Sequence, residues 1–122
     1  MNTFFPEIKK NFGFGCMRFP KDGETVDISA VQAMVDAFLA AGFNYFDTAR
    51  PYHKGCSETV LRQVLTSRYP REKYILTNKL SPGFFEKEED ILPLFEDQLK
   101  VCGVEYFDFY LFHANSLKRH DF

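Results

Sequence analysis

Four residues with titratable side chains lie where predicted strands end. They are Asp47, Tyr52, Lys79 and His113. Asp47, Lys79 and His113 each end an apolar segment, and Tyr52 follows Asp47 in the same predicted loop. The carboxyl ends of parallel strands meet at one rim of a sheet or barrel, where such folds place their chemistry. We therefore expect a carboxylate, a phenol, an ammonium and an imidazole at a common rim.

These four groups together suit the protonation of a carbonyl oxygen. Tyrosine, with an ordinary pKa of about 10, is a weak acid at pH 7, and an ammonium such as Lys79 favours its phenolate form. A carboxylate such as Asp47 would keep that ammonium charged. An imidazole such as His113 could orient the bound carbonyl or relay a proton. A hydride would then reach the carbonyl carbon from another molecule.

Each residue alone also fits an ordinary structural role. Asp47 could cap its loop, and Tyr52 could be a half-buried loop aromatic. Lys79 could extend from a strand end to solvent, and His113 could be a hydrogen-bonded core histidine. The chemical interpretation depends on the four occurring together.

The elements expected to position these residues alternate along the chain. Strands are predicted from residue 12, over 43–47 and 74–79, and from 106 or 107 to 112, with helices from Asp27 or Ser29 to Gly42, over 57–69 and over 86–102. Residues 1–11 are expected to form a lead-in strand or cover, and 20–24 a turn. Pro93 could instead start the third helix, with the acidic stretch before it forming a separate turn.

This order predicts an α/β fold of parallel (β/α) units joined by right-handed crossovers. Two architectures fit the pattern: a small open doubly wound sheet, and the first half of a TIM-type (β/α)8 barrel. Chemistry shared among successive strand ends favours the barrel. Residues 1–122 are then expected to be a single domain of about four strands and three helices.

Composition excludes several classes of function. The net charge of -2 provides no electrostatic footprint for nucleic acid or an anionic membrane. No signal peptide or membrane-spanning segment is recognisable. The cysteines Cys16, Cys56 and Cys102 lack partners at metal-ligand spacing, so we expect reduced thiols, a cytoplasmic protein and no metal site.

Several motifs resemble the N-terminal half of the aldo/keto reductase family. The matching segments are 13–18 (GFGCMR), 47–52 (DTARPY) with Gly55, Ser57 and Glu58, 78–79 (NK) and 106–113 (YFDFYLFH). The resemblance implies a (β/α)8 barrel that uses NADPH to reduce aldehydes or ketones to alcohols. It implies a catalytic tetrad of Asp47, Tyr52, Lys79 and His113, with Tyr52 as the general acid.

The same resemblance places the nicotinamide end of the cofactor near Gly15, Cys16, Met17 and Asp47. The Cys16-Met17-Arg18 segment is similar to a bacterial branch whose members often carry an iron-sulfur extension. The family's second half, which supplies most other cofactor contacts, is not in these 122 residues.

We therefore expect this chain alone to be an inactive part of an enzyme acting on small carbonyl compounds. An alternative function is a non-catalytic half-barrel that self-associates, or pairs with another chain, through open sheet edges. A third hypothesis is an open α/β regulatory domain in which the four titratable residues occur at the rim by coincidence.

Overall fold

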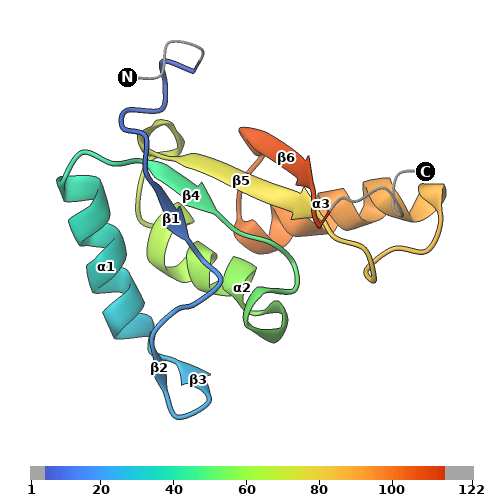
Figure 1. Cartoon of the computed structure of the whole chain (residues 1–122), viewed down its shortest axis with the longest axis horizontal. Coiled ribbons are helices and arrows are strands. Elements are labelled where there is room, and N and C mark those ends of the chain that lie inside the picture. The colour runs from blue at the N-terminus through green and yellow to red at the C-terminus, as the bar shows by residue number, and fades with distance from the viewer. Residues whose placement is uncertain (1–4, 115–122) are drawn as a thin grey trace.

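A four-stranded parallel sheet organises the structure, a computed structural model that describes residues 5–114. The strand order is β1-β4-β5-β6 (Figure 1). These strands are β1 (Gly13–Gly15), β4 (Tyr45–Asp47), β5 (Ile75–Leu80) and β6 (Phe109–Phe112). The order follows the chain, as expected for consecutive (β/α) units. The sheet therefore has β1 and β6 at its two edges.

The register of the strands aligns the predicted rim. Gly15 pairs with Asp47, and Asp47 pairs with Thr77. Lys79 lies two residues after Thr77 and pairs with Leu111. Because side chains alternate between the two faces of a strand, all five residues lie on the same face.

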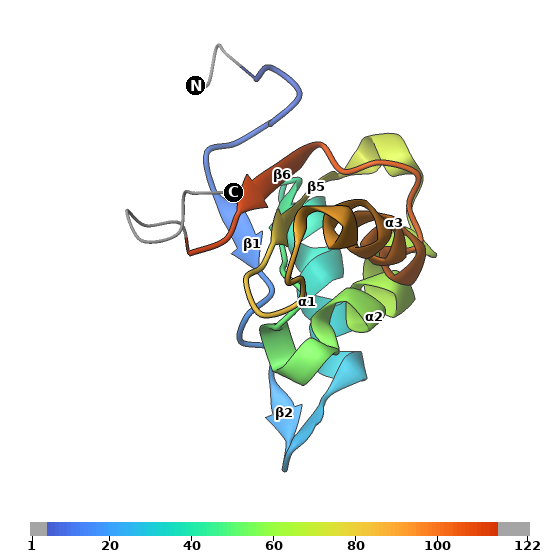
Figure 2. The ribbon, with the colours of Figure 1, turned by 90° about the vertical axis from the view of Figure 1, so that its right-hand side faces the viewer.

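Three helices cover the opposite face of the sheet, as Figure 2 shows. They are α1 (Ile28–Ala40), α2 (Ser57–Leu61) and α3 (Ile91–Cys102). We call this side the helix-covered face, and we call the other side, which carries Tyr45, Asp47, Thr77, Lys79 and Leu111, the open face.

The ends of α1 form as the sequence predicts. Asp27 is the N-cap residue, and its carboxylate accepts a hydrogen bond from the Ala30 amide at 3.1 Å. Gly42, just after the C-terminus, has a φ of 94°, which glycine adopts without steric cost. Val31 and Val35 are fully buried on one side of this helix. The helix therefore lays one face on the sheet, as expected.

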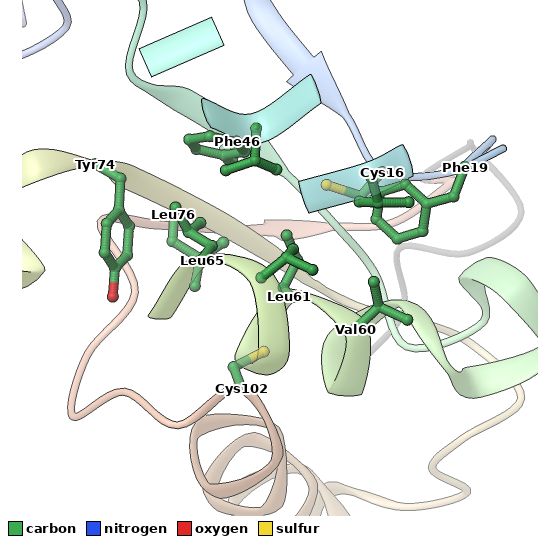
Figure 3. Close-up of a cluster of buried hydrophobic side chains, with 12 residues drawn as sticks. Cys16, Phe19, Phe46, Val60, Leu61, Leu65, Tyr74, Leu76 and Cys102 are labelled. Carbon is green, nitrogen blue, oxygen red and sulfur yellow. The ribbon is translucent and has the colours of Figure 1, made fainter. Parts of the chain in front are cut away.

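The core lies between the sheet and the helices. Phe46, Leu61, Leu65 and Leu76 are completely buried there, together with the Cys16 side chain (Figure 3). Burial of a Phe or Leu side chain contributes about 1.5–3 kcal/mol. Apolar burial on the helix-covered face is therefore the main force holding the (β/α) units together.

Some predicted boundaries were wrong. The turn predicted over 20–24 is confined to Gly23 and Glu24, which join two short strands, β2 (Lys21–Asp22) and β3 (Thr25–Val26), in a hairpin. The second helix changes at Arg62 to a π-type turn, η2 (Arg62–Thr66), so it ends before Tyr69. A short 3-10 turn, η3 (Arg71–Lys73), leads into β5. Strand β4 begins at Tyr45 rather than at residue 43.

The third helix and the fourth strand also begin later than predicted. The acidic stretch forms a separate turn, η4 (Glu88–Asp90), so Pro93 lies in the first turn of α3, where its missing N–H costs no hydrogen bond. Before β6, the Asp108 carboxylate accepts from the Leu76 amide at 2.8 Å and pairs with Arg71. The Asp108 side chain thus accepts a hydrogen bond that a backbone carbonyl would accept in a regular sheet, so β6 begins only at Phe109.

The segment before β1 forms a cover and, over its described residues, no strand. The Lys9 amide donates to Asn44 Oδ1 at 3.1 Å, and Asn44 Nδ2 donates to the Glu7 carbonyl at 2.9 Å. Phe5 packs edge-to-face on Phe109. This segment is therefore fastened beside the amino ends of the central strands.

Candidate active site

The Lys79 ammonium is the centre of the predicted rim. It donates to Asp47 Oδ2 at 2.8 Å, to the Tyr52 hydroxyl at 3.0 Å and to the Thr48 carbonyl at 3.0 Å. These contacts match the three N–H donors of an ammonium. The Lys79 side chain is only 10% exposed, so little water solvates its charge and the Asp47 carboxylate supplies the counter-charge instead. The structure therefore brings three of the four predicted residues into direct contact.

A short turn after β4 returns Tyr52 to this ammonium. The turn η1 (Tyr52–Gly55) is preceded by a hydrogen bond from the Tyr52 amide to the Ala49 carbonyl. Inside it, His53 and Lys54 both have left-handed backbone angles, with φ values of 53° and 54°. This backbone lets the phenol lie over the strand ends, with the Lys79 ammonium 4.8 Å from its ring centre.

His113 joins the site through its ring. The ring packs edge-to-face on Tyr52, with the ring centroids 5.7 Å apart, and Nδ1 lies 2.8 Å from the Ser81 hydroxyl. Burial, assisted by the charge of Lys79 and partly opposed by Asp47, lowers the pKa of His113. The imidazole is therefore neutral at pH 7. All four predicted residues lie at one rim, and Ser81 is a neighbour that the sequence analysis missed.

A second polar cluster lies beneath Lys79, on the helix-covered face. Glu58 is 1% exposed, and its Oε2 accepts from Asn78 Nδ2 at 2.7 Å and from Gln98 Nε2 at 3.0 Å. Its other oxygen pairs with Arg50 Nε at 2.8 Å. We call Arg50, Glu58, Asn78 and Gln98 the buried polar cluster.

The buried polar cluster holds the main chain of Lys79. Asn78 Oδ1 accepts from the Lys79 amide at 2.8 Å, and Gln98 Nε2 lies 3.1 Å from the Lys79 carbonyl. Tyr110 donates to Gln98 Oε1, and burial raises the pKa of Tyr110 to about 12, so it remains a donor. The sequence singled out Glu58 and Asn78 only as parts of motifs, because the contacts that join Glu58, Asn78 and Gln98 to one another span 20 or 40 residues.

The residues predicted to bind the cofactor leave open space beside Asp47. A Cβ built on Gly15 would meet no atom within 4 Å, and Met17 is half exposed. Cys16 turns its side chain into the core, where burial raises the pKa of its thiol, and its amide donates to the Asp47 carbonyl at 2.9 Å. There is therefore space for a flat ring to approach the backbone beside Asp47.

Other kinds of site receive no support from the described part of the chain. Across residues 5–114, no three His, Cys, Asp or Glu side chains come together in a way that could hold a metal ion. In the same residues, each helix is too short or too polar to cross a membrane.

Two known proteins similar in sequence to this chain are an oxidoreductase and a reductase. An uncharacterized oxidoreductase from Schizosaccharomyces pombe is 27% identical over 109 residues, which cover 88% of this chain and 39% of that protein. An NAD(P)H-dependent D-xylose reductase from Pyricularia oryzae is 30% identical over 110 residues, covering 88% of this chain and 34% of that protein. The chain therefore spans less than half the length of these relatives.

Solved structures share the fold of this chain. An aldo-keto reductase from Klebsiella pneumoniae, solved in complex with NADPH, superposes with a TM-score of 0.69 at 24% identity, covering 85% of this chain and 35% of that one. Such neighbours are (β/α)8 barrels, so the predicted fold class, parallel (β/α) units from the first part of a barrel, is confirmed. The model of the aldo/keto reductase family matches residues 11–120. This chain therefore belongs to the aldo/keto reductase family.

Proposed function

We propose that this chain carries the acid–base site of an enzyme that reduces small aldehydes or ketones to alcohols with NADPH. The observation that carries the proposal is the Lys79 ammonium, which contacts both the Asp47 carboxylate and the Tyr52 hydroxyl. A phenol next to a largely desolvated ammonium is suited to releasing its proton, because the cation stabilises the phenolate that remains.

Bound NADPH would supply the hydride, with its nicotinamide end held beside Gly15, Cys16, Met17 and Asp47. This chain's residues would manage the proton. Tyr52 would transfer its hydroxyl proton to the carbonyl oxygen as the carbon accepts the hydride, which yields the alcohol.

His113 would orient the substrate in this mechanism. When the Ser81 hydroxyl donates to Nδ1, the proton of the neutral ring lies on Nε2. That N–H can donate a hydrogen bond to the carbonyl oxygen. The Asp47 carboxylate would remain paired with the Lys79 ammonium.

The experiment that tests the proposal substitutes Tyr52 in a version extended to eight strands. We expect Tyr52→Phe to lower kcat by about 100-fold or more, because it removes the proton donor. Tyr45→Phe is the matched control, since the Tyr45 hydroxyl contacts Thr77 Oγ1 at 2.6 Å rather than Lys79. Near-normal kcat in Tyr52→Phe would move the proton-donor role to His113.

We propose that residues 1–122 are one domain, the N-terminal half of the barrel, and that alone they do not reduce carbonyls. The share of the relatives' length that the chain covers, 39% and 34%, supports this view. NADPH fluorescence titration of the 122-residue chain, compared with the eight-stranded version, tests it. Micromolar binding and turnover by the short chain would contradict the proposal.

The three free thiols support a cytoplasmic location.

A second candidate function is a non-catalytic half-barrel that self-associates. It is favoured by the two sheet edges, β1 and β6, and by the half-exposed Leu111 on the open face of β6. Unpaired edge strands template pairing with another chain. Sedimentation of the purified chain tests this function, and a stable monomer at high concentration would count against it.

A further inference from the structure

His53 connects the turn that carries Tyr52 to the loop that follows β1. The Phe19 amide donates to His53 Nε2 at 2.7 Å, and the two rings stack with centroids 4.8 Å apart and planes 5° apart. Phe19 is 5% exposed and belongs to the core (Figure 3). One end of η1 is therefore anchored to a rigid part of the molecule.

The backbone of η1 depends on such anchoring. His53 and Lys54 are consecutive non-glycine residues in the left-handed region, which is unfavourable for L-residues. Contacts of the turn must offset this cost. The Tyr52 hydroxyl is held by Lys79, and the His53 ring is held by Phe19. The turn is thus fixed on both sides of the bond between Tyr52 and His53.

We propose that His53 is a positioning residue that keeps Tyr52 over Lys79, and that protonation of the His53 ring releases the Tyr52 turn. The inference rests on the proposed function, because it concerns how the proton donor is held. It goes beyond that function by adding a residue outside the predicted tetrad and a dependence on pH.

The hydrogen bond explains the sensitivity to pH. A neutral imidazole can accept the Phe19 N–H at Nε2, whereas the imidazolium carries a proton on both nitrogens and accepts nothing. The space beside the ring is also lined by Lys21 and Glu24 of the β2–β3 hairpin, and by Lys54 and Cys56 of the ring's own segment. Two of these neighbours are cationic and one is anionic, so their net charge disfavours a third cation.

The direction of titration agrees with this geometry. Burial, and then the charge of Lys21, lower the pKa of His53. A histidine whose pKa is lower in the folded state adds stability above its unfolded value, about 6.5, and loses it as the pH falls through the folded value. The turn is therefore closed at pH 7 and opens in mildly acidic solution.

NMR spectroscopy on the full 122-residue chain, labelled with ¹⁵N and with ¹³C in the Tyr and His rings, tests the proposal between pH 7.5 and 5. The Phe19 amide protection factor should fall by about fivefold or more as His53 titrates. The Tyr52 ring signals, assigned with Tyr52→Phe, should move along the same titration curve.

Two variants separate the hydrogen bond from the charge. Both variants are made with His113→Gln, because the His113 ring also packs on Tyr52 and would titrate in the same range. His53→Gln retains an acceptor but cannot titrate, so the Tyr52 signals should keep their pH 7.5 positions throughout. His53→Phe retains a ring but no acceptor, so its Tyr52 signals should already be shifted at pH 7.5. His113→Gln alone should leave the Phe19 titration unchanged.

The proposal is overturned if the Phe19 protection factor or the Tyr52 ring signals do not follow the titration curve of His53. It is also overturned if these signals still change over the same pH range in His53→Gln. These readouts require no turnover. An eight-stranded version that fails to reduce carbonyls would refute the proposed function and leave the His53 result standing.

Discussion

The two faces of the sheet are built from different interactions. On the helix-covered face, Phe46 and Leu76 are fully buried against helices. On the open face, Tyr45 contacts Thr77 through hydroxyl groups, and Asp47 contacts Lys79 through charges. Residues adjacent in sequence thus serve opposite purposes, because side chains alternate across each strand.

The difference shows how one short strand can carry both fold and chemistry. Apolar burial on the helix-covered face fixes the backbone of β4 and β5, so the open face can hold charged groups that contribute little to stability. The buried polar cluster is the exception, since it places a carboxylate among the helices directly behind Lys79. Substitutions on the two faces should therefore differ in magnitude.

The largest expected contrast is between two leucines on opposite faces. Leu76→Ala should lower the free energy of unfolding by about 2–5 kcal/mol, because it removes a fully buried side chain and leaves a cavity. Leu111→Ala, on the open face at 46% exposure, should cost less than about 1 kcal/mol. Urea denaturation followed by circular dichroism measures both. Equal costs would mean that the open face is covered in solution.

The next contrast concerns the two carboxylates that pair with Arg50. Glu58→Gln should cost about 1–3 kcal/mol, since a buried acceptor of several donors is altered. Asp97→Asn removes a carboxylate that is 53% exposed and should cost less than about 1 kcal/mol. The same denaturation assay applies. A larger loss in Asp97→Asn would contradict a structural role for the buried polar cluster.

A smaller effect is expected for the charged pair on the open face. Lys79→Met and Asp47→Asn should each change stability modestly, and the double variant should depart from additivity by about 0.5–1 kcal/mol, because each charge compensates the other. A double-mutant cycle of unfolding free energies measures the coupling. Additive effects would show that the two groups are independent in solution.

The smallest effect lies on neither face. Arg68 and then Tyr69 lower the pKa of Asp36 through hydrogen bonds at the outer surface of α1. Asp36 should therefore add stability above its unfolded pKa, near 3.9, that disappears as the pH falls through its folded value. Urea midpoints between pH 2 and 6 should show a slightly shallower dependence in Asp36→Asn. An unchanged pH profile would show that this contact contributes nothing.

Much of the fold followed from periodicity and turn residues. Helix α1 and its Gly42 stop have local causes, so the sequence was sufficient to predict them, and it narrowed the cap to Asp27 or Ser29, of which Asp27 is the cap. The β2–β3 hairpin was missed because strands of two residues have no periodicity to detect. The late start of β6 depends on Asp108 binding the Leu76 amide, a contact between residues 32 positions apart. Such side-chain substitutes for ladder bonds leave no local pattern.

The candidate site divides in the same way. Asp47, Lys79 and His113 were predictable because strand ends can be predicted from the sequence, and the parallel topology brings those ends together at one rim. Ser81 and Gln98 were not, since their importance lies in what they touch: the His113 ring and the Lys79 carbonyl. A residue whose role is to hold another can be recognised only once both have been placed in space.

The strand register also has a consequence for folding. Gly13 pairs with Tyr45, Tyr45 with Ile75, and Thr77 with Phe109, so every ladder of the parallel sheet joins residues about thirty positions apart. No strand of this sheet can pair with its neighbour until the intervening helix has been synthesised, and non-local pairing of this kind is slow. During synthesis, β1 therefore remains unpaired until β4 has been synthesised, and each later strand then pairs with the strand synthesised before it.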